Sequence, residues 1–297
     1  MVKKKRWGKK YKDNRDWKSY NEQLVKRGEF YINPRFLSTW NKEIEEMNIR
    51  KEGKPYLYPE SMIGFLGILH VKSFHYRDLE GIMRALSRKF NNFPIIDYSQ
   101  ICRRVNKLGI NFNANENDIV AGADGSGIKV SNRGEWMREK WHMKRGWIKV
   151  VVLGDKKGNI VDVKVGNETL DEGESSRNLV KKHHKKIKKF LGDGLYDCNE
   201  MFDLCDQFGI NPVIKIRKNA ASDGFTARAN KARAYKGLGY ERWAEENEYG
   251  ARWPCTEGIF SAVKRIFGEY VSSSREENMY HEAEMKFWAY SQIRKIN

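Results

Sequence analysis

Three acidic residues of this chain stand in surroundings that could do chemistry. In the segment FLGDGLYDCNEMF, a short apolar stretch runs through Gly192 to Asp193, and a helix-like pattern follows. The segment DIVAGADGSGIKV has the same design and carries Asp124. A third carboxylate, Glu257, lies in the helix-like segment TEGIFSAVKRIFG. Two aspartates at predicted strand ends and one helical glutamate supply the oxygen ligands that Mg²⁺ prefers, so they favour a two-metal site.

Two divalent cations about 4 Å apart can activate an attacking oxygen and stabilise a leaving oxygen. The alternative is that each aspartate caps a turn, because Asp124 precedes Gly125 and Asp193 precedes Gly194. Either aspartate alone fits that interpretation. The hypothesis of a site that cuts or joins nucleic acid therefore depends on both aspartates, on Glu257 and on the charge of the chain together.

The segment around Glu257 has the pattern of an amphipathic helix. On a helical wheel, Glu257 and Lys264 fall on one face. The apolar residues form another arc, which would pack on a sheet: Ile259, Phe260, Val263, Ile266 and Phe267. A glutamate and a lysine seven positions apart on one face can serve one site. The alternative is a solvated pair on the surface.

Three other aspartates compete for a role in the site. We predict that Asp197 caps the helix that begins near Cys198. Asp155 lies in a predicted hairpin turn. Asp162 lies in a predicted strand and could point to either face.

The chain is strongly basic. Its 297 residues carry a formal net charge of +17, and 40% of them are hydrophobic, which allows one large domain or two smaller ones. The charge favours a polyanionic partner, most simply DNA or RNA. Residues 1–18 form a basic arm with nine Lys or Arg and two acids. The arm could neutralise phosphates or be a solvated tail, and its candidate DNA contacts are Lys3, Lys4, Lys5 and Arg6.

The longest apolar run, Met62 to Val71, is too short to span a bilayer, and the basic start of the chain does not read as a signal peptide. The four cysteines form no CxxC pair, which argues against zinc. These features favour a reducing cytosol. We expect no membrane partner.

Residues 19–117 are predicted to form a helical domain. Proline residues start two of its helices, at Pro34 and at Pro59. Two later segments, Tyr76 to Leu86 and Ser99 to Leu108, are typical of a helix-turn-helix-like DNA reader. Its exposed cations would be Arg103, Arg104 and Lys107. The alternative is an ordinary helical packing domain.

From residue 118 onward the pattern changes to a mixed α/β layout. A hairpin, three further short strands and four helices are predicted, with strands at 119–123, 147–153, 160–165, 190–192 and 212–216 and helices at 175–189, 199–208, 256–268 and 279–294. The helix at 175–189 would place its lysines on one face: Lys181, Lys182, Lys185, Lys186, Lys188 and Lys189. Residues 217–250 have no clear assignment and are a candidate insertion in this domain.

Several blocks, in order along most of the chain, resemble the DDE transposases of prokaryotic insertion sequences. The blocks are WKSYNEQLVKRGEFYIN, DYSQICRRVNKLG, ADGSGIKV around Asp124 and GDGLYD around Asp193. The third catalytic block of the relevant branch reads Tyr, two residues, Arg, three residues, Glu, six residues, Lys. The chain matches it at Tyr249, Arg252, Glu257 and Lys264, except that four residues separate Arg252 from Glu257.

The resemblance implies an RNase H-like catalytic domain, spanning 118–297, preceded by the helical DNA-binding domain. It implies that Asp124, Asp193 and Glu257 hold two Mg²⁺ ions, for which Mn²⁺ can substitute, and that they catalyse hydrolysis at transposon ends followed by 3′-hydroxyl attack on target DNA. Lys264 and Arg252 would contact phosphates near the cut. Tyr249 would stack on, or hydrogen-bond to, the terminal nucleotide.

The implied partners are double-stranded DNA with terminal inverted repeats and the target DNA. Because a transposase acts on two DNA ends, the resemblance implies at least a dimer on DNA. It also implies a location in the cytoplasm, in association with the nucleoid. The alternatives are an RNase H-like nuclease without strand transfer, a domesticated DNA-binding protein and a helix-turn-helix regulator. The nuclease would need no reader of specific ends, and the regulator would need no acids at strand ends.

Overall fold

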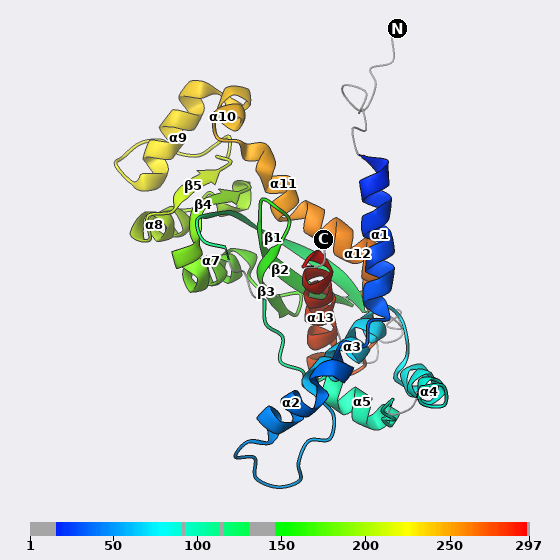
Figure 1. The fold of residues 1–297 in the computed structure, drawn as a ribbon. Coiled ribbons are helices and arrows are strands. Elements are labelled where there is room, and N and C mark those ends of the chain that lie inside the picture. The colour runs from blue at the N-terminus through cyan, green and yellow to red at the C-terminus, as the bar shows by residue number, and fades with distance from the viewer. Residues whose placement is uncertain (1–15, 91–92, 113–115, 131–145, 296–297) are drawn as a thin grey trace.

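A computed structural model describes residues 16–90, 93–112, 116–130 and 146–295 of the chain. The predicted contacts of the basic arm, Lys3, Lys4, Lys5 and Arg6, lie outside these residues. A sheet at the centre carries helices on both faces, and the first helices of the chain gather at one side of it (Figure 1).

The sheet has six strands in the order β3-β2-β1-β4-β5, with β6 paired to β1. The strands are β1 (Ile119–Val130), β2 (Trp147–Asp155), β3 (Ile160–Gly166), β4 (Ile187–Gly192), β5 (Asn211–Ile214) and β6 (Tyr270–Val271). β2 runs antiparallel to β1 and β3, whereas β4 and β6 run parallel to β1, and β5 runs parallel to β4. This mixed sheet confirms the predicted α/β class and agrees with an RNase H-like domain.

The predicted hairpin is confirmed in β2 and β3. Its turn is held by Asp155, whose buried Oδ1 accepts from the backbone N–H groups of Lys157 (2.9 Å) and Asn159 (2.8 Å). Gly158 adopts φ +82°, a left-handed conformation that favours glycine. Asp155 is therefore a turn residue, as predicted.

Alternate residues of β2 face two different cores. Val150 and Val152 join the cluster under helices α12 (Glu257–Phe267) and α13 (Glu276–Arg294). Val151 and Leu153 join the cluster under α7 (Glu172–His183) and α8 (Asn199–Gln207). This period of two follows from the pleat of the strand, and it explains why β2 reads as a continuous apolar run rather than an alternating one.

The predicted helix at 175–189 is wrong in its bounds. α7 ends at His183, a single 3₁₀ turn follows, and β4 begins at Ile187. Pairing of Ile187 and Phe190 with β1 outweighs the helical preference of the lysines, because it buries both apolar side chains. The six lysines therefore do not form one helical face.

The segment that lacked an assignment contains two helices, α9 (Ala227–Leu238) and α10 (Tyr240–Glu246), separated by Gly239 at φ +75°. A short helix, α11 (Arg252–Cys255), then leads directly into α12. The helices α9 and α10 lie beyond β5, at the edge of the sheet (Figure 1).

The N-terminal helices are α1 (Trp17–Tyr31), α2 (Phe36–Asn48), α3 (Glu60–Val71), α4 (Tyr76–Ser87) and α5 (Tyr98–Val105). α3 is buried along most of its length and packs against α13, where Met285 lies over Gly67. His281 on α13 also lies 2.7 Å from the carbonyl oxygen of Val105. One apolar cluster thus continues from the N-terminal helices into the sheet, and the predicted boundary between residues 117 and 118 stays a prediction.

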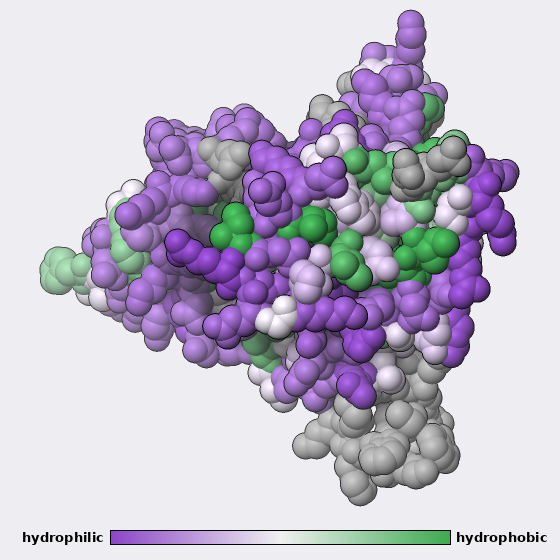
Figure 2. Space-filling view, turned by 60° about the horizontal axis from the view of Figure 1, so that its bottom comes forward, coloured by the Kyte–Doolittle hydropathy of each residue, from purple (hydrophilic) through white to green (hydrophobic). Residues whose placement is uncertain are grey.

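Hydrophilic side chains cover most of the face in Figure 2, and apolar side chains gather there in separate small groups. In the part of the chain that the structure describes, no helix combines the length and the apolar character needed to cross a membrane.

Candidate active site

Asp124 lies inside β1, so the prediction that the strand ends there is wrong. Its Cα is paired with that of Val152, and the antiparallel ladder with β2 continues as far as Lys129. The parallel ladder with β4, however, makes its last pair at Gly122 and Leu191. Asp124 is therefore the second residue beyond the point where β1 loses its neighbour on the β4 side.

Asp193 directly follows β4, as predicted. Its Oδ1 accepts from the N–H of Leu195 at 2.8 Å and caps the 3₁₀ turn Gly194–Tyr196. The turn-capping interpretation is thus also correct for this residue. The cap fixes the carboxylate at the carboxyl end of the strand beside β1.

Arg252 links two of the three acids. Its Nη1 lies 3.6 Å from Oδ2 of Asp124, and its Nη2 donates to Oε1 of Glu257. The backbone N–H of Gly125 donates to Oδ1 of Asp124 at 2.9 Å. The guanidinium therefore stands between the carboxylates of β1 and α12.

Close contact of α11 with the sheet positions Glu257. Gly122 and Gly154 are cross-strand partners on β1 and β2. A Cβ at Gly154 would lie 2.2 Å from the carbonyl oxygen of Cys255, and one at Gly122 would lie 3.0 Å from Cβ of Cys255. Because this pair of glycines leaves room for the α11 backbone, the next helix begins beside β1.

The predicted apolar face of α12 is confirmed, since Ile259, Phe260, Val263 and Phe267 are buried. On its other face, Nζ of Lys264 donates to Oγ of Ser126 at 2.9 Å. Ser126 lies two residues past Asp124 on β1. Lys264 therefore reaches β1 close to Asp124, whereas Glu257 is exposed and is linked to that strand through Arg252.

A fourth carboxylate, Glu172, was not predicted. It begins α7, and its Oε2 lies 3.5 Å from Nζ of Lys149. A side chain at Gly125 would place its Cβ 2.3 Å from the same oxygen. Its Oε1 accepts from the hydroxyl of Tyr196 at 3.4 Å. In sequence, Glu172 reads as an acidic first turn of a helix, and the only hint of its position is the glycine after Asp124.

The electrostatic surroundings of Asp124 favour a cation. Burial raises the pKa of Asp124 to about 6, and the charges of Glu172 and Asp193 act in the same direction, against the Gly125 N–H and Arg252. The donor set, carboxylates alone, fits a hard divalent ion. Within the described residues, however, no three His, Cys, Asp or Glu side chains already stand in positions to hold a metal, and Arg252 lies between two of the acids.

Tyr249 belongs to the packing beneath the site. Its ring is buried against Trp243, and its hydroxyl donates to the carbonyl oxygen of Gly192 at 3.0 Å. This position does not leave the ring face open for stacking on a base. A contact of Tyr249 with DNA stays a prediction.

Asp197 does not cap a helix, contrary to the prediction. Its carboxylate is buried and accepts from Nε and Nη2 of Arg228 (2.7 and 3.1 Å) and from the N–H of Arg217 (2.9 Å). The guanidinium of Arg228 and the backbone N–H of Arg217 therefore take the carboxylate that was predicted to cap α8. Asp162 points away from the site, toward Lys182 and His183.

The cations of the predicted DNA reader point in different directions. Arg103 and Lys107 are exposed, as predicted. Arg104 is half-buried, so the prediction of its exposure is wrong: its guanidinium lies over the ring of Tyr56 and donates to the carbonyl oxygen of Tyr58 at 3.3 Å.

Two family models match the chain, and each is described as a transposase DDE domain. One matches residues 25–133 and the other residues 117–291. Among solved structures, the chain is similar to a piggyBac transposase in a synaptic complex with hairpin DNA. That likeness has a TM-score of 0.39 and 9% sequence identity, and it covers 91% of this chain and 75% of the other.

Proposed function

Because this chain belongs to the transposase DDE domain family, we propose that it cuts DNA at the ends of a transposable element and joins the freed 3′-hydroxyl to target DNA. The observation that supports this most is the meeting of Asp124 and Glu257 at Arg252, with Asp193 capping the 3₁₀ turn that follows the strand beside β1. The charge of Asp193 also acts on Asp124, and the chain that carries these acids is strongly basic.

In this proposal, Asp124, Asp193 and Glu257 hold two Mg²⁺ ions, or Mn²⁺ in their place. When bound, the ions would activate the attacking oxygen and stabilise the leaving oxygen of the phosphodiester. The protein contributes position: the Asp193 cap and the contact of α11 with the sheet fix where the carboxylates stand.

Two cations of the site have separate roles in the proposal. Arg252 neutralises Asp124 and Glu257 before the ions bind, and it then turns toward a DNA phosphate. Lys264 exchanges the hydroxyl of Ser126 for a phosphate near the cut. Tyr249 supports the backbone at Gly192, directly before Asp193.

The partners in this proposal are double-stranded DNA with terminal inverted repeats and the target DNA. Two ends must be held at once, so at least two copies of the chain would assemble on them. Such a protein would work at the bacterial nucleoid, in the cytoplasm.

The test is a cleavage assay on labelled DNA that carries the sequence flanking this gene, with Mg²⁺ or Mn²⁺. Wild type is compared with Asp193→Asn and with Asp203→Asn, which removes an exposed carboxylate from α8. We expect cuts at the repeat ends and joined products with wild type and Asp203→Asn, and neither with Asp193→Asn or with EDTA.

Each alternative predicts a different result. Metal-dependent cuts without preference for the ends, and without joined products, would identify a nuclease. Binding without cutting under either metal would overturn the enzymatic proposal in favour of a domesticated or regulatory DNA-binding protein. Equal cutting by wild type and Asp193→Asn would remove Asp193 from the site.

A further inference from the structure

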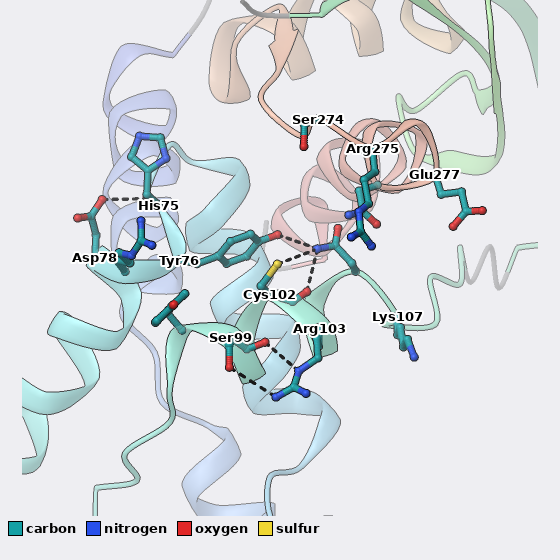
Figure 3. Close-up of a pocket in the computed structure, with 14 residues that line it drawn as sticks. His75, Tyr76, Asp78, Ser99, Cys102, Arg103, Lys107, Ser274, Arg275 and Glu277 are labelled. Carbon is teal, nitrogen blue, oxygen red and sulfur yellow. Dashed lines mark hydrogen bonds between the residues drawn. The ribbon is translucent and has the colours of Figure 1, made fainter.

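A groove lined by basic side chains lies apart from the acidic residues of the candidate active site. This groove, of about 1190 Å³, opens between α4, α5 and the start of α13 (Figure 3). Its walls come from segments far apart in the chain, since α4 and α5 belong to the N-terminal helices, whereas α13 comes after Glu257 and α12. The groove thus joins the predicted DNA reader to the C-terminal helix that packs on the sheet.

Four cationic side chains line the groove, and all four are exposed: Arg77, Arg103, Lys107 and Arg275. Two acids also line it, Asp78 and Glu277, and Asp78 accepts from the backbone N–H of His75 at 3.0 Å. The balance of charge favours an anion. Arg77 and Arg275 were not expected from the sequence.

The contacts of these cations leave their charges available. The guanidinium of Arg77 lies over the ring of Tyr98, 4.8 Å from its centroid, and Nε of Arg103 donates to the carbonyl oxygen of Ser99 at 3.2 Å. Neither of these two contacts, within the described part of the chain, pairs the arginine with a carboxylate. The first turn of α13, which has no side-chain cap, also borders the groove and adds positive potential. The first N–H groups of α5 donate to carboxylates of Glu80 and Asp97 instead.

The walls of the groove are held in place by buried or half-buried contacts. Nδ2 of Asn106 donates to the hydroxyl of Tyr76 at 3.2 Å and to the carbonyl oxygen of Cys102 at 2.8 Å, which joins α4 to α5 (Figure 3). Tyr76 also stacks on His70 of α3, with the ring centroids 4.1 Å apart. His281 joins α13 to the carbonyl of Val105. The cations are therefore presented by a preformed wall.

We propose that this groove binds the phosphate backbone of double-stranded DNA, held by Arg77, Arg103 and Lys107 on one side and by Arg275 on the other. These exposed cations form no salt bridge with a carboxylate among the described residues, and in a chain of net charge +17 they match the repeated charges of that backbone. The inference rests on the proposed function for the identity of the DNA. It adds α13 to the DNA-binding surface, so the helix that packs on the catalytic sheet also contacts the bound duplex.

The test measures binding of the full-length protein to a short fluorescein-labelled duplex of the gene's flanking DNA, and to a scrambled duplex, by anisotropy over a range of KCl concentrations. The groove variant is Arg77→Gln/Arg275→Gln. The control Lys42→Gln/Arg242→Gln removes the same charge from two exposed i,i+4 ion pairs elsewhere. Arg77→Lys/Arg275→Lys keeps both charges. Thermal unfolding shows that each variant is folded.

We expect the groove variant to bind both duplexes about ten- to a hundredfold more weakly near physiological salt, with the slope of log K against log salt reduced by about two. Both duplexes lose affinity alike, because phosphate contacts carry no sequence information. The charge-matched control should stay within about twofold of wild type, and the lysine variant should keep most of the slope.

An unchanged slope in the groove variant, or an equal loss in the control, would overturn the inference. The inference would also be overturned if the groove variant lost binding to poly-glutamate but kept its binding to DNA. That result would assign the groove to an acidic protein partner. The proposed function is judged separately by the cleavage assay. If wild type cuts the ends but the groove variant keeps the wild-type slope of log K against log salt, only the groove inference is refuted. If the groove variant loses that slope but wild type does not cut, only the enzymatic proposal is refuted.

Discussion

At the scale of single residues, the site is a set of carboxylates arranged around an internal cation. Arg252 contacts both Asp124 and Glu257, while Glu172 lies against β1 at Gly125 and contributes further negative charge. Burial adds to this repulsion at Asp124. Ionised Asp124 is therefore held at a cost in folding stability, which a bound cation would relieve.

This cost predicts how Asp124→Asn changes stability with pH in the absence of divalent metal. The pKa of Asp124 is about 6 in the folded protein, against 3.8 for the unperturbed group. Between these values, the unfolded chain has released the proton and the folded chain retains it, so the free energy of unfolding of wild type falls as pH rises. The Asn variant does not titrate there, and it should become the more stable protein as pH approaches 6.

Urea unfolding of both proteins with EDTA, from pH 4 to neutral, would check this. The difference in the free energy of unfolding between Asp124→Asn and wild type should grow between pH 3.8 and about 6 and level off above it. Mg²⁺ added at neutral pH should then stabilise wild type and leave Asp124→Asn unchanged. A difference that is constant over the whole range would show that burial does not act on this carboxylate.

The sequence indicated some of these residues and missed others for physical reasons. Asp193 was predicted because a buried strand leads directly into it, a local pattern. Glu172 and the central place of Arg252 depend on contacts across the sheet. No local pattern reveals that a helix start after β3 lies against the residue that follows Asp124. Asp197 misled the prediction because Arg228, its partner, is 31 positions away.

At the scale of elements, the close approach of α11 to the sheet decides where the third acid stands. The cross-strand glycines Gly122 and Gly154 let the backbone at Cys255 come within contact distance of β1 and β2. Glu257 is only two residues further along. A side chain at Gly122 or Gly154 would therefore change the distance between Asp124 on β1 and Glu257 on α12.

Gly154→Ala tests this geometry. Its Cβ would lie 2.2 Å from the carbonyl oxygen of Cys255, a backbone atom that cannot rotate away, so α11 must shift. We expect a loss of about 1–3 kcal/mol in the free energy of unfolding, as for other overpacked sites. We also expect end cleavage to fall by about a hundredfold, because a shift near 1 Å misplaces Glu257.

Gly81→Ala in α4 is the matched control, since nothing lies within 4 Å of its Cβ position. In a helix interior it should raise the free energy of unfolding by about 0.5–1 kcal/mol and leave cleavage unchanged. Chemical denaturation and the cleavage assay give both readouts. Full activity in Gly154→Ala would mean that the position of α11 is not set by this contact.

The hairpin was predictable from two apolar runs around a turn-forming segment, and α12 from an apolar face that repeats along the chain. The bounds of α7 and β4 were not. Lysine-rich residues 181–189 have helical preference, and the sheet overrides it by pairing Ile187 and Phe190 with β1. Such pairing depends on a strand more than fifty residues earlier, which a local pattern cannot report.

At the scale of the whole molecule, one apolar cluster joins the N-terminal helices to the sheet through α13. Met285 is 1% exposed, and its Sδ lies 2.8 Å from the Cβ position of Gly67 on α3. With so much shared core, the two regions should unfold together although the sequence predicts separate domains.

Met285→Ala should lower the free energy of unfolding by about 2–5 kcal/mol, as for other large-to-small core changes. Far-UV circular dichroism and tryptophan fluorescence should report one coincident transition, both in wild type and in the variant, moved to lower denaturant concentration. Val25→Ala, at an exposed site on α1, should change the free energy by less than about 0.5 kcal/mol. Two separated transitions would restore the picture of independent domains.

The carbonyl oxygen of Gly192 has a consequence for how this family can vary. It accepts from the N–H of Lys215 at 3.1 Å and from the hydroxyl of Tyr249 at 3.0 Å, so both ends of the α9–α10 segment close on one atom beside Asp193. The number of residues between these ends therefore does not by itself set the spacing of the acids, and lengthening the segment at an exposed position adds mainly a slowly varying loop-closure entropy. A relative could carry an added module there, and a designer could graft one, provided that Arg228 still pairs with Asp197 and Trp243 still packs on Tyr249.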